Sequence, residues 1–268
     1  PYAAFPDSPA WELSSPLERV SRGIKMLMFR RLLSQVDVLV AQNEVLARQL
    51  KALYQIDSVP VVNNAVSLDN LDKGQSHDFQ LGDGFKLLCL SAYYSHKNIE
   101  VFIPLAQRIK ESGLKIKIIT TLEKGQSKAA NTFLQNVRAY GLGKIIKNVG
   151  NVPMTKVPSL YRQTDALLLP TLLESFSGTY VEAMFHRKPI ITSDLPFAHG
   201  VCGGAAAYFD PLNESSIFEA ILEVINRPEE CEIRVRVGDE LLGSMPTWNQ
   251  AYKQFTEIFS QILGEHTR

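Results

Sequence analysis

Apolar and polar positions follow a regular rhythm along most of the chain. From residue 86 onward, short apolar runs alternate with segments whose apolar residues recur every three to four positions, as in buried strands between amphipathic helices. The expected strands are 86–90, 115–120, 145–149, 166–169, 189–192 and 205–209. The expected helices are 98–112, 127–140, 155–163, 178–187 and 214–226. This order predicts an α/β fold, a doubly wound parallel sheet with helices on both faces.

The first 66 residues follow a different pattern. Residues 17–35 are expected to form a helix, and Asn43 is placed to cap a second helix over 44–54. Short apolar runs predict strands at 37–42 and 59–62. The apolar face of the first helix consists of Leu17, Val20, Ile24, Leu27 and Met28. Two strands and two helices are too few for a domain of this type, so we interpret residues 1–66 as the closing part of a second Rossmann-like domain.

The remaining boundaries follow from polarity and from the end of the strand–helix alternation. Residues 67–84 are polar and are interpreted as a linker, 85–246 as the main domain, and 247–268 as a C-terminal helix that packs back toward the N-terminal part. The apolar stripe expected to make that packing is Trp248, Tyr252, Phe255 and Phe259.

Composition narrows the function classes. The formal net charge is zero, so no global charge favours nucleic acid, and an anionic ligand must be met by local groups. Cys89, Cys202 and Cys231 are widely spaced, which predicts buried free thiols in a reducing cytoplasm and no zinc site. We find no apolar run long enough to span a bilayer and no secretory pattern in residues 1–16.

The loop after the first strand of the main domain carries a candidate anion site. Lys97 stands just before an expected helix N-terminus, where free backbone N–H groups and the helix dipole favour an anion. His96 is a possible further donor. The ordinary alternative, a surface lysine beside a capping Asn98, is equally compatible with the sequence.

The segment 171–182 carries a second candidate. Ser177, Gly178 and Thr179 begin a helix, where backbone amides can approach phosphate closely. Glu174 precedes them and Glu182 follows within the helix. Two carboxylates beside an anion site fit a ligand that also has hydroxyl groups, as a nucleotide sugar has. The alternative is that both are solvated carboxylates, one of them offsetting the helix dipole.

Two further loops after strands are weaker candidates. Gly150, Asn151 and Val152 can present backbone groups to the edge of a base, although an ordinary turn is favoured. Asp194 and His199 can contact a ligand or serve as a cap and a turn. The sequence has no Walker lysine motif, no GxGxxG at a strand-to-helix turn, no GxSxG, no HExxH and no acidic cluster for magnesium.

These four segments, in this order, resemble the C-terminal half of GT-B glycosyltransferases of the family 4 type. Glu174 and Glu182 match that family's E-x7-E motif, and residues 188–194 match the stretch that follows it. The resemblance covers roughly residues 84–263, and 36–66 resemble the end of that family's N-terminal domain on the acceptor side.

The resemblance implies a retaining transferase that moves a hexose-type sugar from a UDP- or GDP-linked donor to a saccharide or lipid-linked acceptor, without a metal or cofactor. It implies that Glu182 binds the ribose hydroxyls and Glu174 those of the donor sugar. Lys97 and the amides near Gly178 would neutralise the diphosphate, and thereby stabilise the leaving group. Residues 150–152 would face the base.

The sequence departs from the family's pattern in several places. The departures are Ser91-Ala92 for a Gly-Arg pair, Ser175 and Ser177 for glycines, Arg187 for a glycine and Gly200 for an acidic residue. Without the arginine, Lys97 carries more of the diphosphate charge. The family's opening strands, with the loop that supplies a catalytic histidine, are also absent, so we expect an incomplete chain.

Three hypotheses follow. The first is a retaining glycosyltransferase of polysaccharide or glycolipid synthesis, inactive alone if its acceptor half is missing. The second is a non-catalytic donor-binding subunit completed by a separate chain. The third, a sugar-nucleotide epimerase, lacks candidate acid/base groups. The helix at 17–35 carries five basic residues and can lie on an anionic membrane surface at the inner face, although a solvated face is favoured.

Overall fold

The protein folds around a six-stranded sheet that is entirely parallel. The computed structural model describes residues 2–68 and 71–266. The strands are β1 (Phe85–Cys89), β2 (Ile116–Thr120), β3 (Ile146–Asn148), β4 (Ala166–Leu169), β5 (Ile190–Ser193) and β6 (Ala206–Phe209). Their spatial order is β3-β2-β1-β4-β5-β6. The predicted doubly wound α/β sheet is therefore confirmed.

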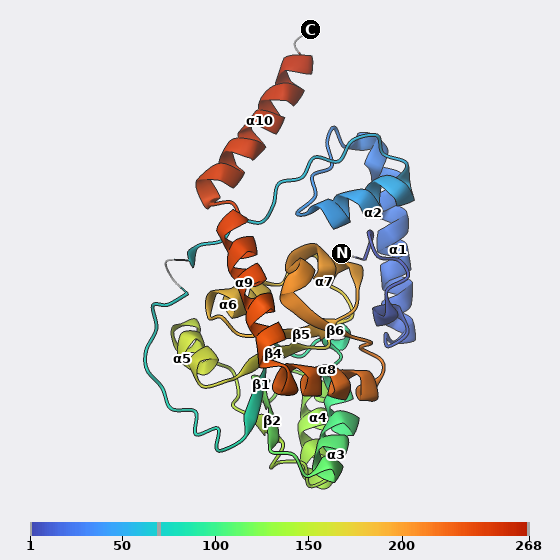
Figure 1. Ribbon diagram of the computed structural model, residues 1–268. Helices are drawn as coiled ribbons and strands as arrows, with labels where there is room; N and C mark the ends of the chain where they lie inside the picture. Colours follow the sequence, from blue (N-terminus) through green and yellow to red (C-terminus); the bar gives the residue numbers. More distant parts are fainter. Residues whose placement is uncertain (1, 69–70, 267–268) are drawn as a thin grey trace.

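Helices cover both faces of the sheet, as strands of continuous apolar residues require. In Figure 1, α6 (Gly178–Phe185) and α7 (Pro196–Cys202) lie above the sheet. Below it lie α3 (Phe102–Ser112), α4 (Lys128–Ala139) and α8 (Glu214–Asn226). A short helix, α5 (Val157–Arg162), follows β3, and α9 (Pro228–Ser244) packs against α6. The sandwiched strand residues form the core, with Leu87, Leu88, Ile118, Ile119 and Leu167 fully buried.

The N-terminal part contains α1 (Pro16–Leu32) and α2 (Glu44–Tyr54), close to the predicted positions. Ser15 and Glu18 start α1 with a capping box, and Asn43 caps α2 as expected. The two strands predicted at 37–42 and 59–62 are wrong. Ala41 and Val61 form only an isolated parallel bridge. Pro60 has no N–H to extend a ladder, and these segments pair with no further strand among the described residues.

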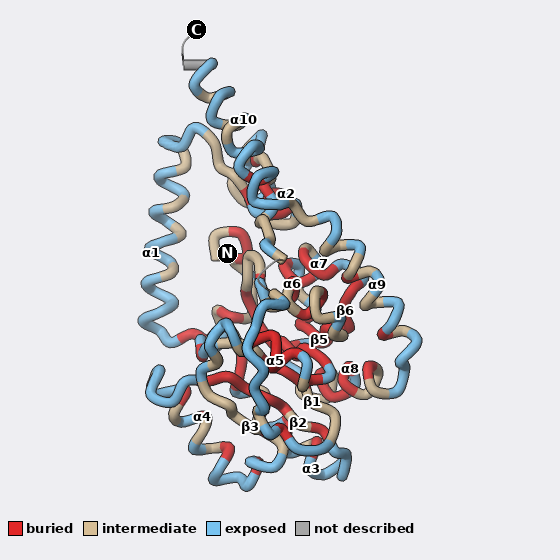
Figure 2. The backbone as a smooth tube through the Cα atoms, turned by 90° about the vertical axis from the view of Figure 1, so that its left-hand side faces the viewer, coloured by how far each residue is buried: buried red, intermediate tan, exposed pale blue. Residues whose placement is uncertain are grey.

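Two other expectations differ from the structure. The sequence predicts a loop over residues 192–200, but Pro196–Cys202 form α7, with Pro196 in its first turn. The apolar stripe of α10 (Trp248–His266) does not pack as predicted, because Trp248, Tyr252, Phe255 and Phe259 are all exposed. The apolar face of α1 is exposed as well, and α1 is mostly pale blue in Figure 2.

The predicted linker, 67–84, runs along α5 where it is described, and residues 69–70 lie outside the described part. Gln75 N–H donates to the carbonyl of Thr155 (2.7 Å), and His77 N–H to Ser159 Oγ (3.1 Å). The segment is thus bound to the sheet domain. The four-part division of the chain itself stays a prediction.

Candidate functional site

The site lies where the direction of winding reverses. From β1 the chain winds outward through β2 and β3, and from β4 it winds the other way through β5 and β6. The loops after β1 and β4 therefore diverge at the carboxyl edge of the sheet and leave a crevice, the usual ligand position in such folds. Hydrogen bonds join the two loops: the carbonyl of His96 accepts from Leu172 N–H (2.7 Å) and from Thr171 Oγ1 (3.2 Å).

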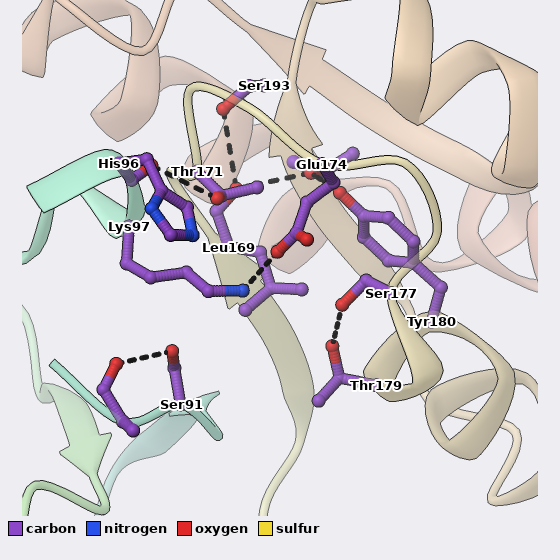
Figure 3. Close-up of polar contacts among 12 residues, drawn as sticks. Ser91, His96, Lys97, Leu169, Thr171, Glu174, Ser177, Thr179, Tyr180 and Ser193 are labelled. Atoms are coloured by element: carbon purple, nitrogen blue, oxygen red, sulfur yellow. Dashed lines mark hydrogen bonds and ion pairs between the residues drawn. The ribbon is translucent and has the colours of Figure 1, made fainter. Parts of the chain in front are cut away.

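Lys97 and Glu174 meet in this crevice (Figure 3). Lys97 Nζ donates to Glu174 Oε1 in an ion pair whose side chains are only 17% and 15% exposed. Partial removal from water strengthens such a pair relative to one on the surface. Two predicted site residues separated by 77 positions are thus brought into contact, and an arriving anion would compete with Glu174 for the ammonium group.

The turn around Lys97 differs from the expectation. Ser95–Lys97 is a single 3-10 turn, and α3 begins only at Phe102. Asn98 does not cap a helix with its side chain. It has a left-handed backbone (φ 53°), and its Nδ2 donates to the carbonyl of Pro211 (2.7 Å). The backbone turn, anchored by Asn98, therefore positions Lys97.

His96 is a neutral group at physiological pH. Burial, reinforced by the charges of Lys97 and Arg22, lowers its pKa from 6.5 to about 4. Its ring lies parallel to that of Tyr94, with centroids 5.6 Å apart. It can donate or accept a hydrogen bond beside Lys97 but adds no positive charge. Arg22 belongs to α1, so the N-terminal part also shapes the electrostatics here.

The N-terminus of α6 is available to an anion. Ser177 is the N-cap residue, but its side chain makes no capping hydrogen bond, and its Oγ lies 2.8 Å from Thr179 Oγ1 instead. A Cβ placed on Gly178 would meet no atom within 4 Å. The first amides of α6 thus have no side-chain cap, and Gly178 among them is exposed, which suits phosphate oxygens. Ser177 has φ −111°, so glycine is not required at this departure from the family's pattern.

Glu182 lies one turn into α6 and is held from α5. Tyr161 Oη donates to Glu182 Oε2 (3.1 Å) and lies 3.2 Å from the carbonyl of Thr179. Burial raises the pKa of Glu182, and the hydrogen bond from Tyr161 opposes that shift. The sequence reasoning missed Tyr161. A tyrosine on an apolar helix face needs a partner for its hydroxyl when buried, which was the available signal.

The other predicted contacts lie farther along the sheet edge. Gly150, Asn151 and Val152 follow β3, the outer strand two positions from β1. Gly150 has φ +77°, a conformation that favours glycine. His199 Nε2 and Asp194 Oδ1 lie 2.6 Å apart, so both potential ligand contacts are already paired with each other.

The local geometry at two departures from the family's pattern bears on which residue is favoured. Arg187 adopts φ 52° at the C-terminus of α6, the left-handed conformation for which glycine is preferred. Gly200 lies in α7 against α2, and a Cβ there would come within 2.9 Å of Val45 Cγ2. Any side chain at 200, acidic or otherwise, would push α2 away from α7.

Other chemistry has little support. The three cysteines are buried and free, as predicted, and burial raises the pKa of Cys89 to about 12. Within residues 2–68 and 71–266, no three His, Cys, Asp or Glu side chains cluster in a way that could hold a metal ion. Over the same residues, no helix combines the length and apolar character needed to cross a bilayer.

Comparison with known proteins decides the family. The family described as glycosyl transferases group 1 matches residues 75–239, more than half of the chain. The chain belongs to this family. It is also 27% identical, over 179 residues, to the O-antigen chain mannosyltransferase RfbU of Salmonella typhimurium. That match covers 66% of this chain and 47% of the relative, so the chain spans about half of that protein's length.

Solved GT-B glycosyltransferases share the fold of this member of the family. A sucrose-phosphate synthase from Thermosynechococcus elongatus has a TM-score of 0.74 at 14% identity, covering 89% of this chain and 61% of that one. A glycosyltransferase from Rickettsia africae has a TM-score of 0.71 at 16% identity, covering 88% and 67%. Anabaena HepE in complex with UDP-glucose has a TM-score of 0.69 at 14% identity, covering 84% and 64%.

Proposed function

We propose that this chain forms the donor-binding part of a retaining hexosyltransferase that uses a UDP- or GDP-linked sugar. The observation that carries the proposal is the Lys97–Glu174 pair at the reversal of the sheet, beside the uncapped N-terminus of α6. A cation, free amides and a carboxylate in one crevice match a ligand that combines diphosphate with hydroxyl groups.

The roles follow from this arrangement. Lys97 and the amides of Ser177, Gly178 and Thr179 bind the diphosphate and stabilise the charge that grows on it as the bond to the anomeric carbon breaks. Glu174, released from Lys97, accepts hydrogen bonds from the donor sugar. His96, neutral at pH 7, donates a hydrogen bond to the donor sugar.

Glu182 accepts hydrogen bonds from the ribose hydroxyls. Tyr161 already occupies one oxygen of that carboxylate and holds its orientation. The loop at Gly150, Asn151 and Val152 faces the base. No metal or cofactor takes part.

The relatives suggest the chemistry of donor and acceptor. RfbU is named as a mannosyltransferase of the O-antigen chain, and HepE is described in complex with UDP-glucose. A hexose donor and a saccharide or lipid-linked acceptor of a bacterial polysaccharide pathway, acting in the cytoplasm, fit both names. The alternative is a non-catalytic donor-binding subunit that needs a separate acceptor-binding chain. It predicts the same donor binding, but no sugar transfer by this chain alone.

Thermal shifts with UDP-glucose, GDP-mannose and an ADP-sugar test donor binding. We expect one donor to raise the melting temperature of the wild-type chain, and Glu182→Ala to abolish that rise. Glu219→Ala, an exposed glutamate on α8, is the matched control and should respond as wild type. The site assignment is wrong if no nucleotide sugar shifts the melting temperature, or if Glu182→Ala responds normally.

We also propose that α1 contacts a membrane surface near a lipid-linked acceptor, through its apolar row more than its charges. Arg19 donates to the carbonyls of Glu12 and Ser14, Arg22 lies over the ring of Tyr2 (4.1 Å), and Arg30 lies near the ring of Tyr54. Three of the five predicted basic residues therefore bind within the molecule, whereas the apolar row remains exposed.

Co-sedimentation with anionic vesicles tests this contact. Ile24→Ser combined with Leu27→Ser should abolish binding, because it interrupts the apolar row. The matched control is Phe255→Ser combined with Phe259→Ser, which alters the equally exposed stripe of α10 and should leave binding unchanged. Full binding by the α1 variant would refute the proposal.

A further inference from the structure

The loop that carries Glu174 is held from the other part of the chain by two hydrogen bonds. Ser8 Oγ donates to the carbonyl of Leu172 (2.6 Å), and Asn43 Nδ2 donates to the carbonyl of Ser175 (2.9 Å). These partners are 164 and 132 positions apart in the sequence. The two bonds bracket Glu174, two residues before it and one residue after it. The backbone around the carboxylate is therefore fixed from residues 1–66.

Asn43 is well suited to such a role because both ends of its amide are used. Its Oδ1 accepts from Leu46 N–H (2.8 Å) and caps α2. That bond sets the orientation of the amide plane, so Nδ2 is directed at Ser175. Serine or aspartate would cap α2 equally well, but neither supplies an N–H donor for the second bond. The cap alone thus does not explain asparagine at this buried position.

The helix that Asn43 caps, α2, is itself closely packed. α2 lies against α7, and Gly200 allows Val45 to approach so closely that an added Cβ would come within 2.9 Å of Val45 Cγ2. Near Ser8, which makes the other bond, Phe5 and Phe197 meet edge to face, with ring centroids 6.4 Å apart. The segments that carry both donors therefore pack against α7, through Val45 and Phe5.

We propose that Asn43 is a positioning residue that fixes loop 170–177, and through it Glu174, in the conformation that binds the donor. The inference rests on the proposed function and adds a residue that lies outside the donor crevice. Without the Asn43–Ser175 bond, the loop samples more conformations, and donor binding must select among them. A single neutral hydrogen bond corresponds to about a 3- to 10-fold loss of donor affinity.

Four variants of the full chain test this. Asn43→Ser and Asn43→Asp keep a helix cap and remove the donor to Ser175. Asn213 caps α8 through Ser215 and Ser216 N–H and has no bond to the loop. Asn213→Ser and Asn213→Asp are therefore matched controls for changes at a cap. We expect Asn43→Asp to show the larger effect, because a carboxylate would face the carbonyl of Ser175.

Two readouts separate positioning from general destabilisation. The first is the dissociation constant of UDP-glucose or GDP-mannose, whichever binds the wild-type chain. It should rise about 3- to 10-fold in the Asn43 variants only. The second is amide hydrogen exchange of residues 170–180 without any donor, which should accelerate in the Asn43 variants only. Both readouts are taken well below the melting temperature of every variant, so that global unfolding contributes to neither.

The outcomes distinguish this inference from the proposed function. If wild type binds neither probe, the proposed function fails, and the role of Asn43 in donor binding fails with it. If wild type binds a probe and the Asn43 variants bind it equally well, only the positioning role is overturned. Unchanged exchange at 170–180 in Asn43→Ser would show that the bond does not restrain the loop, whichever donor binds.

Discussion

The sheet domain and the two peripheral helices have equally regular apolar patterns and opposite burial. Leu88, Ile119 and Leu168 are fully buried, whereas Leu17 of α1 is 80% exposed and Trp248 of α10 is 67% exposed (Figure 2). A periodic pattern shows which side of an element is apolar, but it does not show what covers that side. In the sheet domain, the helices between strands cross back over the sheet and supply the cover.

The sheet domain and the N-terminal part contribute to the site in different ways. The sheet edge provides the groups that meet a ligand, Lys97 and Glu174 among them. The N-terminal part restrains the loop through Asn43 and lowers the pKa of His96 through the charge of Arg22. The packed region thus supplies chemistry, and the peripheral region adjusts its geometry and electrostatics.

The largest difference in the free energy of unfolding is expected between two alanine variants, one of a leucine in the sheet and one of an isoleucine on α1. Leu88→Ala should lower the free energy of unfolding by about 2–5 kcal/mol, because it leaves a cavity in a closely packed core. Ile24→Ala should change it by less than about 0.5 kcal/mol, because its side chain is more than half exposed. Urea unfolding of both variants measures the difference. A cost above 2 kcal/mol for Ile24→Ala would show that α1 is buried in solution.

Burial and strand pairing decide which elements of the fold the sequence predicts correctly. Strands of continuous apolar residues, such as 166–169, were assigned correctly because each is short, buried on both faces and followed by an amphipathic helix. The strands at 37–42 and 59–62 were assigned wrongly because strand formation depends on pairing partners, which the local pattern does not include. α7 is not predicted because its seven residues are too few for a helical period to stand out. Proline in the first turn of the helix is the signal that the sequence offers.

For the site, the sequence predicts those contacts that follow from the order of the strands in the sheet. The contact between the loops of Lys97 and Glu174 follows once β1 and β4 are neighbours in a doubly wound sheet. The roles of Tyr161 and Asn43 do not follow, because each depends on how one helix packs against another element. Asn43 was correctly predicted to cap α2, but its second bond reaches 132 residues along the chain, and no local pattern contains it.

The next effect concerns His96, on which both regions act. Its folded-state pKa of about 4 lies below its ordinary value of 6.5, so the unfolded chain binds the proton first on acidification. The contribution of His96 to stability is complete above pH 6.5 and is lost as the pH falls toward 4. The unscreened shift corresponds to about 3 kcal/mol, which solvent screening of this half-buried ring reduces to about 1–2 kcal/mol.

Urea unfolding at pH 7 and pH 4.5 measures this contribution. His96→Gln should lose about 1–2 kcal/mol less stability on acidification than wild type. His77→Gln, at an exposed histidine of the 67–84 segment, should behave as wild type. Arg22→Gln should give an intermediate result, because it removes only the charge contributed by α1. If Arg22→Gln leaves the pH dependence unchanged, the peripheral region does not act on this site.

The smallest effect concerns a strained position inside the packed region. Arg187 has φ 52° and closes α6 with two hydrogen bonds, from its own N–H to Met184 (2.9 Å) and from Lys188 N–H to Ala183 (2.8 Å). This is the Schellman arrangement, in which a non-glycine residue costs about 1 kcal/mol. The Arg187 guanidinium also pairs with Asp239 near the surface, which contributes about 0–1 kcal/mol.

Comparing Arg187→Gly with Arg187→Ala isolates the backbone cost, because both variants lose the ion pair and only glycine relieves the strain. Arg187→Gly should be more stable than Arg187→Ala by about 1 kcal/mol and close to wild type. Thermal and urea unfolding measure the difference. Equal stabilities would show that α6 ends without strain at this position. The expected difference would show that the packed sheet domain holds a local backbone conformation that its own sequence disfavours.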